Sequence, residues 1–128
     1  MPRILAIIAA IAAGLAVFTG AFAAHGLDDL PEHQMAWWQT GAQYHMYHAL
    51  GIFAAAWVAS QFAPRLAAAA GWLFLLGIVL FSGSLYVMGV SERLFGEEQR
   101  WLGAITPLGG ISFMIGWLLL AIAAGVRR

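Results

Sequence analysis

Three histidines are the residues of this chain best suited to do chemistry: His25, His45 and His48. His45 and His48 are three positions apart, so a helix places them on one face. Histidine is the commonest metal ligand, and three imidazoles suit zinc, copper or a haem iron. The apolar segments around these histidines contain no acid or thiolate to act as a fourth ligand. This lack favours hydrogen-bonded structural histidines, or a histidine that contacts a small ligand or lipid headgroup, over a metal site.

Tyrosines and hydroxyl groups accompany the histidines at comparable positions of the other apolar segments. Polar side chains within a bilayer are costly and tend to face the protein interior or a wet cavity. We therefore predict a shallow polar pocket that opens to the outer side of the membrane, with a purely structural packing role as the alternative. The candidate ligand-binding residues are His25, Tyr44, Tyr47, His48, Ser82, Ser84, Tyr86 and Thr106.

Membrane-spanning helices are the elements that must position these residues. The chain is 62% hydrophobic and 9% charged, whereas soluble domains contain about 25% charged residues. Four stretches lack Asp, Glu, Lys and Arg, and each supplies the roughly 20 residues needed to cross a ~30 Å hydrocarbon core. We predict an all-α, integral membrane four-helix bundle in one domain, residues 1–128, with spans at about 4–24, 44–62, 67–90 and 107–126.

The arginines are divided unequally between the two ends of such a bundle. Arg3, Arg65, Arg127 and Arg128 share the side of the termini, and Arg93 and Arg100 lie on the other side with all the acids. Cytoplasmic loops carry the excess of Lys and Arg, so we expect both termini in the cytoplasm. The first apolar run is longer than the roughly 7–15 residues of a signal-peptide core, so we expect it to be retained as the first span.

Two local patterns predict helix starts. Asp29 followed by Glu32 fits a capping box with Pro31 in the first turn, which predicts a short interfacial helix in the first outer loop that leads into the second span. Thr106 and Pro107 fit the N-cap and first position of the last span. In the first span, small residues four apart form a face suited to close helix packing: Ala12, Ala16, Gly20 and Ala24.

The predicted topology also places the histidines relative to one another. His25 ends an outgoing span, and His48 lies about one turn into the returning span that starts near Tyr44. Antiparallel neighbours joined by a short loop pack together, at 8–10 Å between axes. We therefore expect His25 and His48 to approach each other close to the segment 82–86.

Several functions are excluded or disfavoured by composition. A net charge of zero offers no basic patch for nucleic acid. The absence of cysteine excludes thiolate chemistry and iron–sulfur clusters. Without carboxylates inside the spans there is no paired general acid and base, so we do not expect an enzyme.

Four ordered segments resemble a known family. They are GAFAAHGL at residues 20–27, YHMYHAL at 44–50, FSGSLY at 81–86, and TPLGG at 106–110 followed by GW at 116–117. These segments are similar to the motifs of the domain-of-unknown-function 423 family, whose eukaryotic relatives are the transmembrane protein 256 group. Ala23 stands where that family usually has glycine, and its pattern includes His25 and His48 but not His45.

The resemblance implies a four-helix bacterial inner-membrane protein and supplies no reaction or cofactor. Some members are associated with envelope integrity and stress tolerance, so our first hypothesis is a non-enzymatic protein that supports membrane or envelope homeostasis through its pocket and partner contacts. One alternative is a protein that binds a quinone, lipid headgroup, haem or metal at His25 and His48. Another is a small oligomeric transporter. The expected partners are the lipid bilayer and either further copies of the chain or other membrane proteins.

Overall fold

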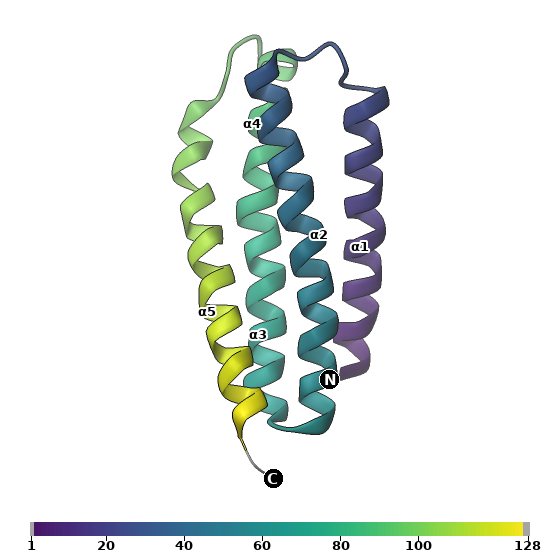
Figure 1. Cartoon of the computed structure of the whole chain (residues 1–128). Helices are drawn as coiled ribbons and strands as arrows, with labels where there is room; N and C mark the ends of the chain where they lie inside the picture. The colour runs from purple at the N-terminus through teal and green to yellow at the C-terminus, as the bar shows by residue number, and fades with distance from the viewer. Residues whose placement is uncertain (1, 127–128) are drawn as a thin grey trace.

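The computed structural model describes residues 2–126, and every regular element in this range is helical. The elements are α1 (Pro2–His25), α2 (Glu32–Gln61), α3 (Pro64–Gly77), the π-helical turn η1 (Ile78–Ser82), α4 (Gly83–Phe95), the 3₁₀ helix η2 (Arg100–Ala104) and α5 (Thr106–Gly125). Figure 1 shows that α3 and α4 follow one another along a single rod, which η1 joins. The all-α prediction is confirmed.

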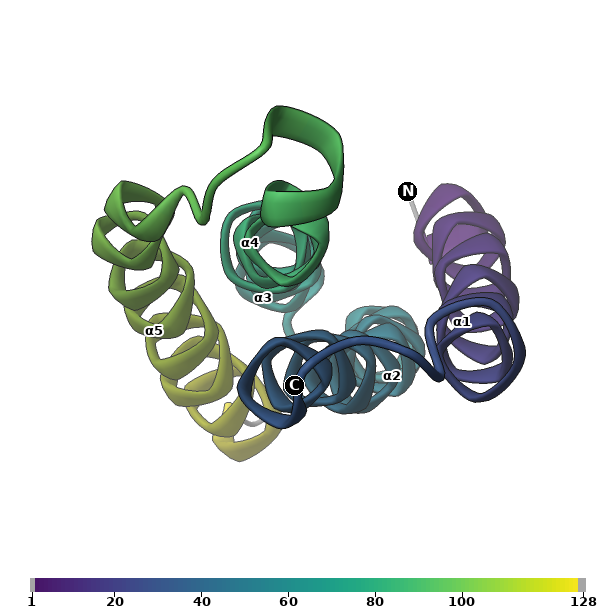
Figure 2. The ribbon, with the colours of Figure 1, turned by 90° about the horizontal axis from the view of Figure 1, so that it is seen from above.

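Helix α2 occupies the middle of the molecule. It packs against α1 on one side and against α3 and α4 on another, while α5 packs mainly against α3 and η1. Seen along the rods, α1 and α5 are therefore the two outer members of the arrangement (Figure 2). Each outer helix has one broad face covered by protein and another that is exposed.

The connections divide the molecule into two ends (Figure 1). The loop end contains the connections at residues 26–31 and 96–99. The terminal end contains the start of α1, the end of α5 and the turn between α2 and α3. Of the arginines used to predict the orientation, Arg127 and Arg128 lie outside the described residues.

Three helices within residues 2–126 are long and apolar enough to cross a membrane: Pro2–His25, Pro64–Phe95 and Arg100–Gly125. Their exposed faces are covered with large apolar side chains such as Ile11, Phe18, Val79 and Leu118. Such faces suit contact with lipid rather than water. Helix α2 has 30 residues, but its polar residues make it less apolar than the other three.

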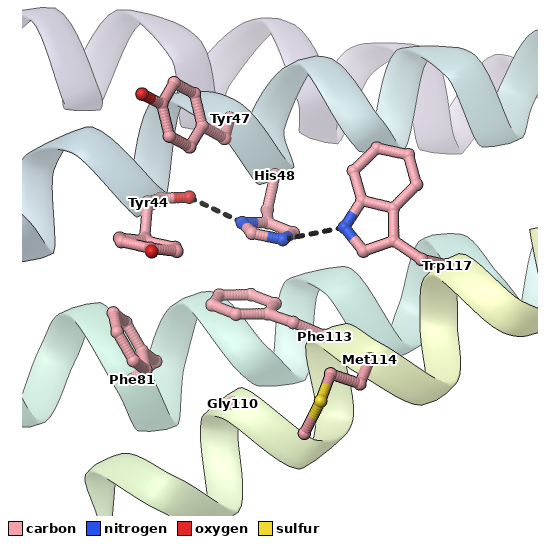
Figure 3. A pocket seen from close by; sticks show the side chains of 8 residues that line it. All are labelled: Tyr44, Tyr47, His48, Phe81, Gly110, Phe113, Met114 and Trp117. Atoms are coloured by element: carbon pink, nitrogen blue, oxygen red, sulfur yellow. Dashed lines mark hydrogen bonds between the residues drawn. The ribbon is translucent and has the colours of Figure 1, made fainter.

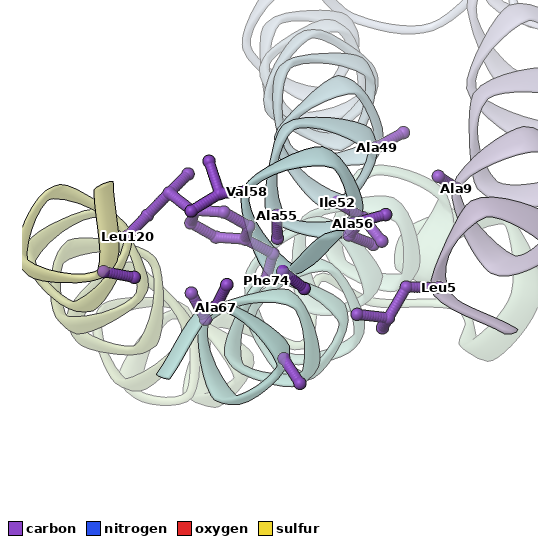
Figure 4. Close-up of a cluster of buried hydrophobic side chains, with 14 of the residues drawn as sticks. Leu5, Ala9, Ala49, Ile52, Ala55, Ala56, Val58, Ala67, Phe74 and Leu120 are labelled. Atoms are coloured by element: carbon purple, nitrogen blue, oxygen red, sulfur yellow. The ribbon is translucent and has the colours of Figure 1, made fainter. Parts of the chain in front are cut away.

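Small residues bring α1 against α2 (Figure 4). Leu5 and Ala9 of α1 are fully buried, and so are Ala49 and Ile52 of α2. Alanine lets backbones approach closely, which increases van der Waals contact where lipid provides no hydrophobic driving force between helices. The largest fully buried side chain, Phe74 of α3, lies in the same cluster.

The packing face predicted on α1 is only half right. Ala12 and Ala16 are buried against the rest of the protein, but Gly20 and Ala24 are exposed. A helix has 3.6 residues per turn, so a stripe of exact four-residue spacing drifts around the helix. The buried face of α1 follows mixed spacings of three and four, as Leu5, Ala9, Ala12 and Ala16 do.

The predicted start of α2 is partly wrong. A helix does begin at Glu32, but it continues without interruption to Gln61, so no separate interfacial helix forms. The predicted capping box is also absent, since Pro31 is the N-cap and no side chain caps the helix. Asp29 binds Arg93 instead, because that guanidinium offers a stronger, charge-assisted partner than a backbone N–H.

The predicted start of α5 is right for Pro107 and wrong for Thr106. Pro107 lies in the first turn, where its missing N–H costs no hydrogen bond. Thr106 is itself the first helical residue, and the residue before it is in the helical conformation. Its hydroxyl shares a 2.6 Å hydrogen bond with Ser84 and lies 3.4 Å from the carbonyl of Leu102. Thr106 therefore links α5 to α4 rather than capping its own helix.

A polar network around Glu98 closes the loop end. The Glu98 carboxylate accepts hydrogen bonds from His33, from Gln34 Nε2 at 3.0 Å and from Arg100 Nε at 2.8 Å. Gln34, which is 1% exposed, also donates to Glu92. The network joins the first turns of α2 to the end of α4 and the following loop. The bonds from Gln34, His33 and Arg100 lower the pKa of Glu98 from 4.5 to about 2.

A second ion pair lies beside this network. Arg93 of α4 binds Asp29 in the first loop, and its hydrogen bond lowers the pKa of the Asp29 carboxyl. Together the two sets of contacts hold the two loops of this end against each other. Both depend on ionised carboxylates.

The Glu98 network should make stability fall in acid. Because the pKa of Glu98 is lowered from 4.5 to about 2 on folding, its contribution is fully present above the higher value and disappears as pH falls through the lower one. We expect wild type to unfold at a higher temperature than Glu98→Gln above about pH 5, and the difference to shrink by about pH 2. Thermal unfolding in a non-ionic detergent measures this. Glu97→Gln, which removes a neighbouring exposed carboxylate, is the control and should follow wild type.

Two adjacent glycines of α5 should respond oppositely to alanine. A Cβ at Gly109 would lie 2.4 Å from the backbone nitrogen of Phe81, which cannot move aside, whereas one at Gly110 would meet only the Phe81 ring at 3.9 Å. We expect Gly109→Ala to cost about 1–3 kcal/mol of unfolding free energy. Gly110→Ala should be neutral or gain up to about 1 kcal/mol from higher helix propensity. Equal effects in reversible unfolding would contradict the close approach of α5 to η1.

Candidate functional site

His48 is held by hydrogen bonds at both ring nitrogens. The indole N–H of Trp117 lies 3.0 Å from His48 Nε2, and His48 Nδ1 lies 2.7 Å from the carbonyl oxygen of Tyr44. An indole nitrogen can only donate, so Nε2 is the acceptor. The proton is therefore on Nδ1, which donates to Tyr44. The ring is neutral, 4% exposed, and stacked on Phe113 with 3.4 Å between ring centroids.

A cleft of about 510 Å³ lies beside His48, between α2 and α5 (Figure 3). Tyr44, Tyr47 and His48 of α2 form one wall, and Phe81 of η1 lies at one end. The wall from α5 consists of Gly110, Phe113, Met114 and Trp117. The lining residues at the rim are themselves exposed, among them Tyr47 and Met114, so the cleft opens sideways from the rods. Its walls are mostly aromatic rings and carry no charged residue.

His45 belongs to a different set of contacts. The hydroxyl of Thr19 donates to the carbonyl of Ala16 at 3.0 Å, so the Thr19 oxygen accepts from the Tyr86 hydroxyl at 2.9 Å. The Tyr86 oxygen lies 2.9 Å from His45 Nδ1, which donates to it. The chain of bonds joins α1, α4 and α2. A smaller cleft of about 270 Å³ lies beside His45, lined otherwise by apolar side chains of α1, α3 and η1.

The expectation that His25 and His48 approach each other is wrong. His25 is the last residue of α1 and is exposed at the loop end. Because α2 begins at Glu32 rather than near Tyr44, His48 is 16 residues into its helix, about 24 Å along the axis. The Trp117 and Phe113 contacts also direct His48 towards α5, whereas α1 lies on the opposite side of α2 (Figure 2).

The three histidines proposed as metal candidates are therefore separated. His25 is exposed, His45 binds Tyr86, and His48 binds Trp117. Among the described residues, no group of three or more His, Cys, Asp or Glu side chains is placed to hold a metal ion. The arrangement does not offer the three-imidazole set that a zinc, copper or haem site at these residues requires.

The predicted hydroxyl groups are also distributed over several surroundings. Ser84 pairs with Thr106, and it donates to the carbonyl of Phe81 at 2.9 Å. Ser82 is fully buried in the π-helical turn, and its hydroxyl has no hydrogen-bond partner within residues 2–126. Tyr86 belongs to the His45 contacts. Of the eight predicted ligand-binding residues, the cleft brings together three: Tyr44, Tyr47 and His48.

The eight predicted residues do not form a pocket that opens at the predicted outer end of the bundle, which is the loop end. The loop end is closed by the Glu98 network, and a small crevice of about 250 Å³ there is lined by Asp29, Gln34, Glu92 and Arg93 with two apolar neighbours. The larger cleft faces sideways and is apolar. Most of the buried polar side chains of the helices instead bind one another, with Ser82 as the exception.

Sequence reasoning missed the contribution of α5 to the site. Gly110, Phe113, Met114 and Trp117 come from a segment that reads as uniformly apolar. Their spacing of three and four residues puts them on one helix face, and Gly110 and Trp117 also belong to the family motifs at 106–110 and 116–117. Nothing in the sequence places that face opposite His48.

A helical protein with several apolar helices of spanning length, and with most of its buried polar side chains hydrogen-bonded inside, is a multi-pass membrane protein. Residues 19–110 match the family described as Protein of unknown function (DUF423), and the chain belongs to this family. It is 48% identical over 124 residues to the UPF0382 membrane protein YwdK of Bacillus subtilis (strain 168). The match covers 95% of this chain and 96% of the relative.

Other relatives are equally complete in coverage. A UPF0382 membrane protein of Staphylococcus epidermidis (strain ATCC 12228 / FDA PCI 1200) is 43% identical over 94% of each chain. The UPF0382 membrane protein SSP2132 of Staphylococcus saprophyticus is 40% identical over 94% of this chain and 95% of its own. No solved structure matches the chain. The relatives confirm a membrane protein, and their names give no activity.

Replacing Trp117 tests the hydrogen bond that fixes His48. Trp117→Phe keeps an aromatic ring but leaves His48 Nε2 buried without its donor, which should cost about 1–3 kcal/mol of unfolding free energy. Trp72→Phe, at a comparably exposed position of α3, is the control and should cost less. In the double variant with His48→Phe both partners are removed, so the total should be smaller than the sum of the single costs. Additive costs in reversible detergent unfolding would contradict the pairing.

Proposed function

We propose that this protein is a non-enzymatic, four-span protein of the bacterial inner membrane that holds a neutral, lipid-soluble molecule in the cleft beside His48. The observation that carries the proposal is the cleft itself: about 510 Å³, lined by aromatic rings and without a charged residue. Ligand pockets of this kind fall in the range of roughly 300–1,000 Å³ and combine apolar walls with a few polar atoms. Through the bound molecule the protein would support membrane or envelope homeostasis.

The fourth span in this proposal is α2. Its 30 residues extend about 45 Å, more than the ~30 Å hydrocarbon core. Its polar residues lower its overall hydropathy, yet Gln34, His45 and His48 are each less than 9% exposed. A spanning helix surrounded by other helices can carry such residues, because they need not face lipid. The central position of α2 in the bundle supports this assignment.

The chemistry of the cleft favours a neutral molecule over a metal ion, a haem or a phosphate headgroup. A metal or haem iron needs a free imidazole nitrogen, and both nitrogens of His48 are already used. A phosphate headgroup needs a cation or several donors, and none of the lining side chains is Arg or Lys. The sideways opening suits a molecule that arrives from the lipid rather than from water.

The orientation proposed puts the terminal end in the cytoplasm. Arg3 and Arg65 lie at that end, whereas Arg93 and Arg100 at the loop end are each bound to a carboxylate. With Arg127 and Arg128, which follow α5 in the sequence, four arginines belong to the terminal side and two to the loop side, and this excess supports the positive-inside assignment. The Glu98 network at the loop end would then lie on the outer side of the inner membrane.

Filling the cleft should remove the ligand. Gly110 lines the cleft and has room for a side chain, since an added Cβ meets only the Phe81 ring at 3.9 Å. Gly110→Leu should therefore fold and occupy the space. Gly20→Leu is the matched control, because Gly20 is exposed on α1 with nothing within 4 Å of an added Cβ.

The measurement is mass spectrometry of lipid-soluble molecules in polymer-excised native discs of each variant. Wild type and Gly20→Leu should carry one class of neutral molecule in excess over the surrounding membrane, and Gly110→Leu should lose that excess. Unfolding temperatures establish that all three are folded. Equal contents in the three proteins would show that the cleft holds no specific ligand.

Cysteine labelling tests the orientation. The chain contains no cysteine, so Glu97→Cys and Gln61→Cys each introduce one thiol, at the loop end and the terminal end respectively, and keep every arginine. In intact spheroplasts an impermeant maleimide should react with Glu97→Cys, and with Gln61→Cys only after permeabilisation. The reverse pattern would overturn the orientation, and labelling of both at equal rates would contradict an even number of spans.

A further inference from the structure

We infer that the molecule held beside His48 is a quinone, with its flat ring in the aromatic cleft and its prenyl tail in the surrounding lipid. The inference rests on the proposed function and names the class of ligand. Three features of the cleft lead to it: the shape of its walls, the kind of polar atom it offers, and the direction in which it opens.

The walls are suited to a flat, unsaturated ring. The ring centroids of Tyr44 and Phe81 are 4.8 Å apart, and those of Phe81 and Phe113 are 5.5 Å apart, with the rings of each pair tilted. These rings contact one another and form a continuous aromatic surface, and a planar ligand that lies over this surface meets ring faces and ring edges, which are the favourable geometries for aromatic contacts. Figure 3 shows these side chains arranged around the same space from α2, η1 and α5. A saturated acyl chain would gain burial here but not these oriented contacts.

Two phenol hydroxyl groups border the cleft, those of Tyr44 and Tyr47, and the proposed donor to the ligand is Tyr47. Gln43 donates to the Tyr47 hydroxyl oxygen at 2.6 Å, so the hydroxyl hydrogen of Tyr47 remains to donate to another acceptor. Trp117 already donates to His48, and His48 donates to Tyr44. A phenol with a free hydroxyl hydrogen can donate it to a ligand that carries acceptor oxygens. Quinone carbonyl oxygens are acceptors only and carry no charge.

The opening provides a path for a tail. Tyr47 is 49% exposed and Met114 is 65% exposed at the rim of the cleft. These residues lie between α2 and α5 on a face that would contact lipid. Methionine is unbranched and adapts to irregular apolar shapes. A prenyl tail can therefore leave the cleft between the two helices without crossing the protein.

Photolabelling with two neutral probes tests the inference. One probe is a short-tailed azidoquinone and the other is a photoreactive diacylglycerol, each added to the full-length protein in phosphatidylethanolamine–phosphatidylglycerol nanodiscs. We expect the azidoquinone to label peptides that contain residues 44–48 or 110–117, and unlabelled quinone but not diacylglycerol to compete. Gly110→Leu should abolish this labelling, and Gly20→Leu should leave it unchanged.

Tyr47→Phe keeps the ring and removes only the hydroxyl. At a subsaturating probe concentration it should lower quinone labelling roughly five- to tenfold, as expected for one lost hydrogen bond. Unchanged labelling in Tyr47→Phe would overturn the quinone assignment. So would labelling of the cleft by the diacylglycerol alone, although the proposed function would then stand. If neither probe gives labelling of the cleft that Gly110→Leu abolishes, both proposals are overturned.

Discussion

The structure depends on the need to pair the buried polar side chains of α2 within the protein. Lipid offers no hydrogen bonds, so an unpaired polar group at membrane depth is costly. Helix α2 meets this requirement with separate hydrogen bonds to α1, α4 and α5. Trp38 donates to the backbone carbonyl of Thr19 in α1 at 2.8 Å, His45 binds Tyr86 of α4, and His48 binds Trp117 of α5. These bonds explain why α2 lies in the middle and why the other helices lie around it.

The same bonds separate two histidines that the helix places on one face. Residues three apart are about 60° apart around a helix axis, which is close enough to share a face but wide enough to meet different neighbours. His45 lies on the side of α1 and α4, and His48 on the side of α5. The single outward pocket expected from sequence becomes two sideways clefts with a different imidazole in the wall of each. One cleft is bordered by rings and the other by aliphatic side chains.

The helical class, three apolar spans and the position of Pro107 could be predicted because they depend on local composition. The depth of His48 could not, since it depends on α2 continuing without a break from Glu32 to Gln61 rather than on a separate span that starts near Tyr44. The choice of Trp117 as partner depends on α5 packing across η1, where Gly109 lets the backbones meet. Pairing between distant segments of this kind leaves no periodic mark in the sequence. The sequence therefore predicted the residues in the α2 wall of the cleft but none of those in its α5 wall.

The π-helical turn between α3 and α4 sets the rotation of everything that follows it. In this turn the N–H of Gly83 binds the carbonyl of Ile78, five residues back, so the turn holds one residue more than an α-helical turn. Each residue of an α-helix advances about 100° around the axis. Deleting one residue here would restore a regular helix but would turn Tyr86 away from Thr19 and His45. The number of residues between Gly77 and Gly83 is thus as much a part of the bundle's hydrogen bonding as any side chain.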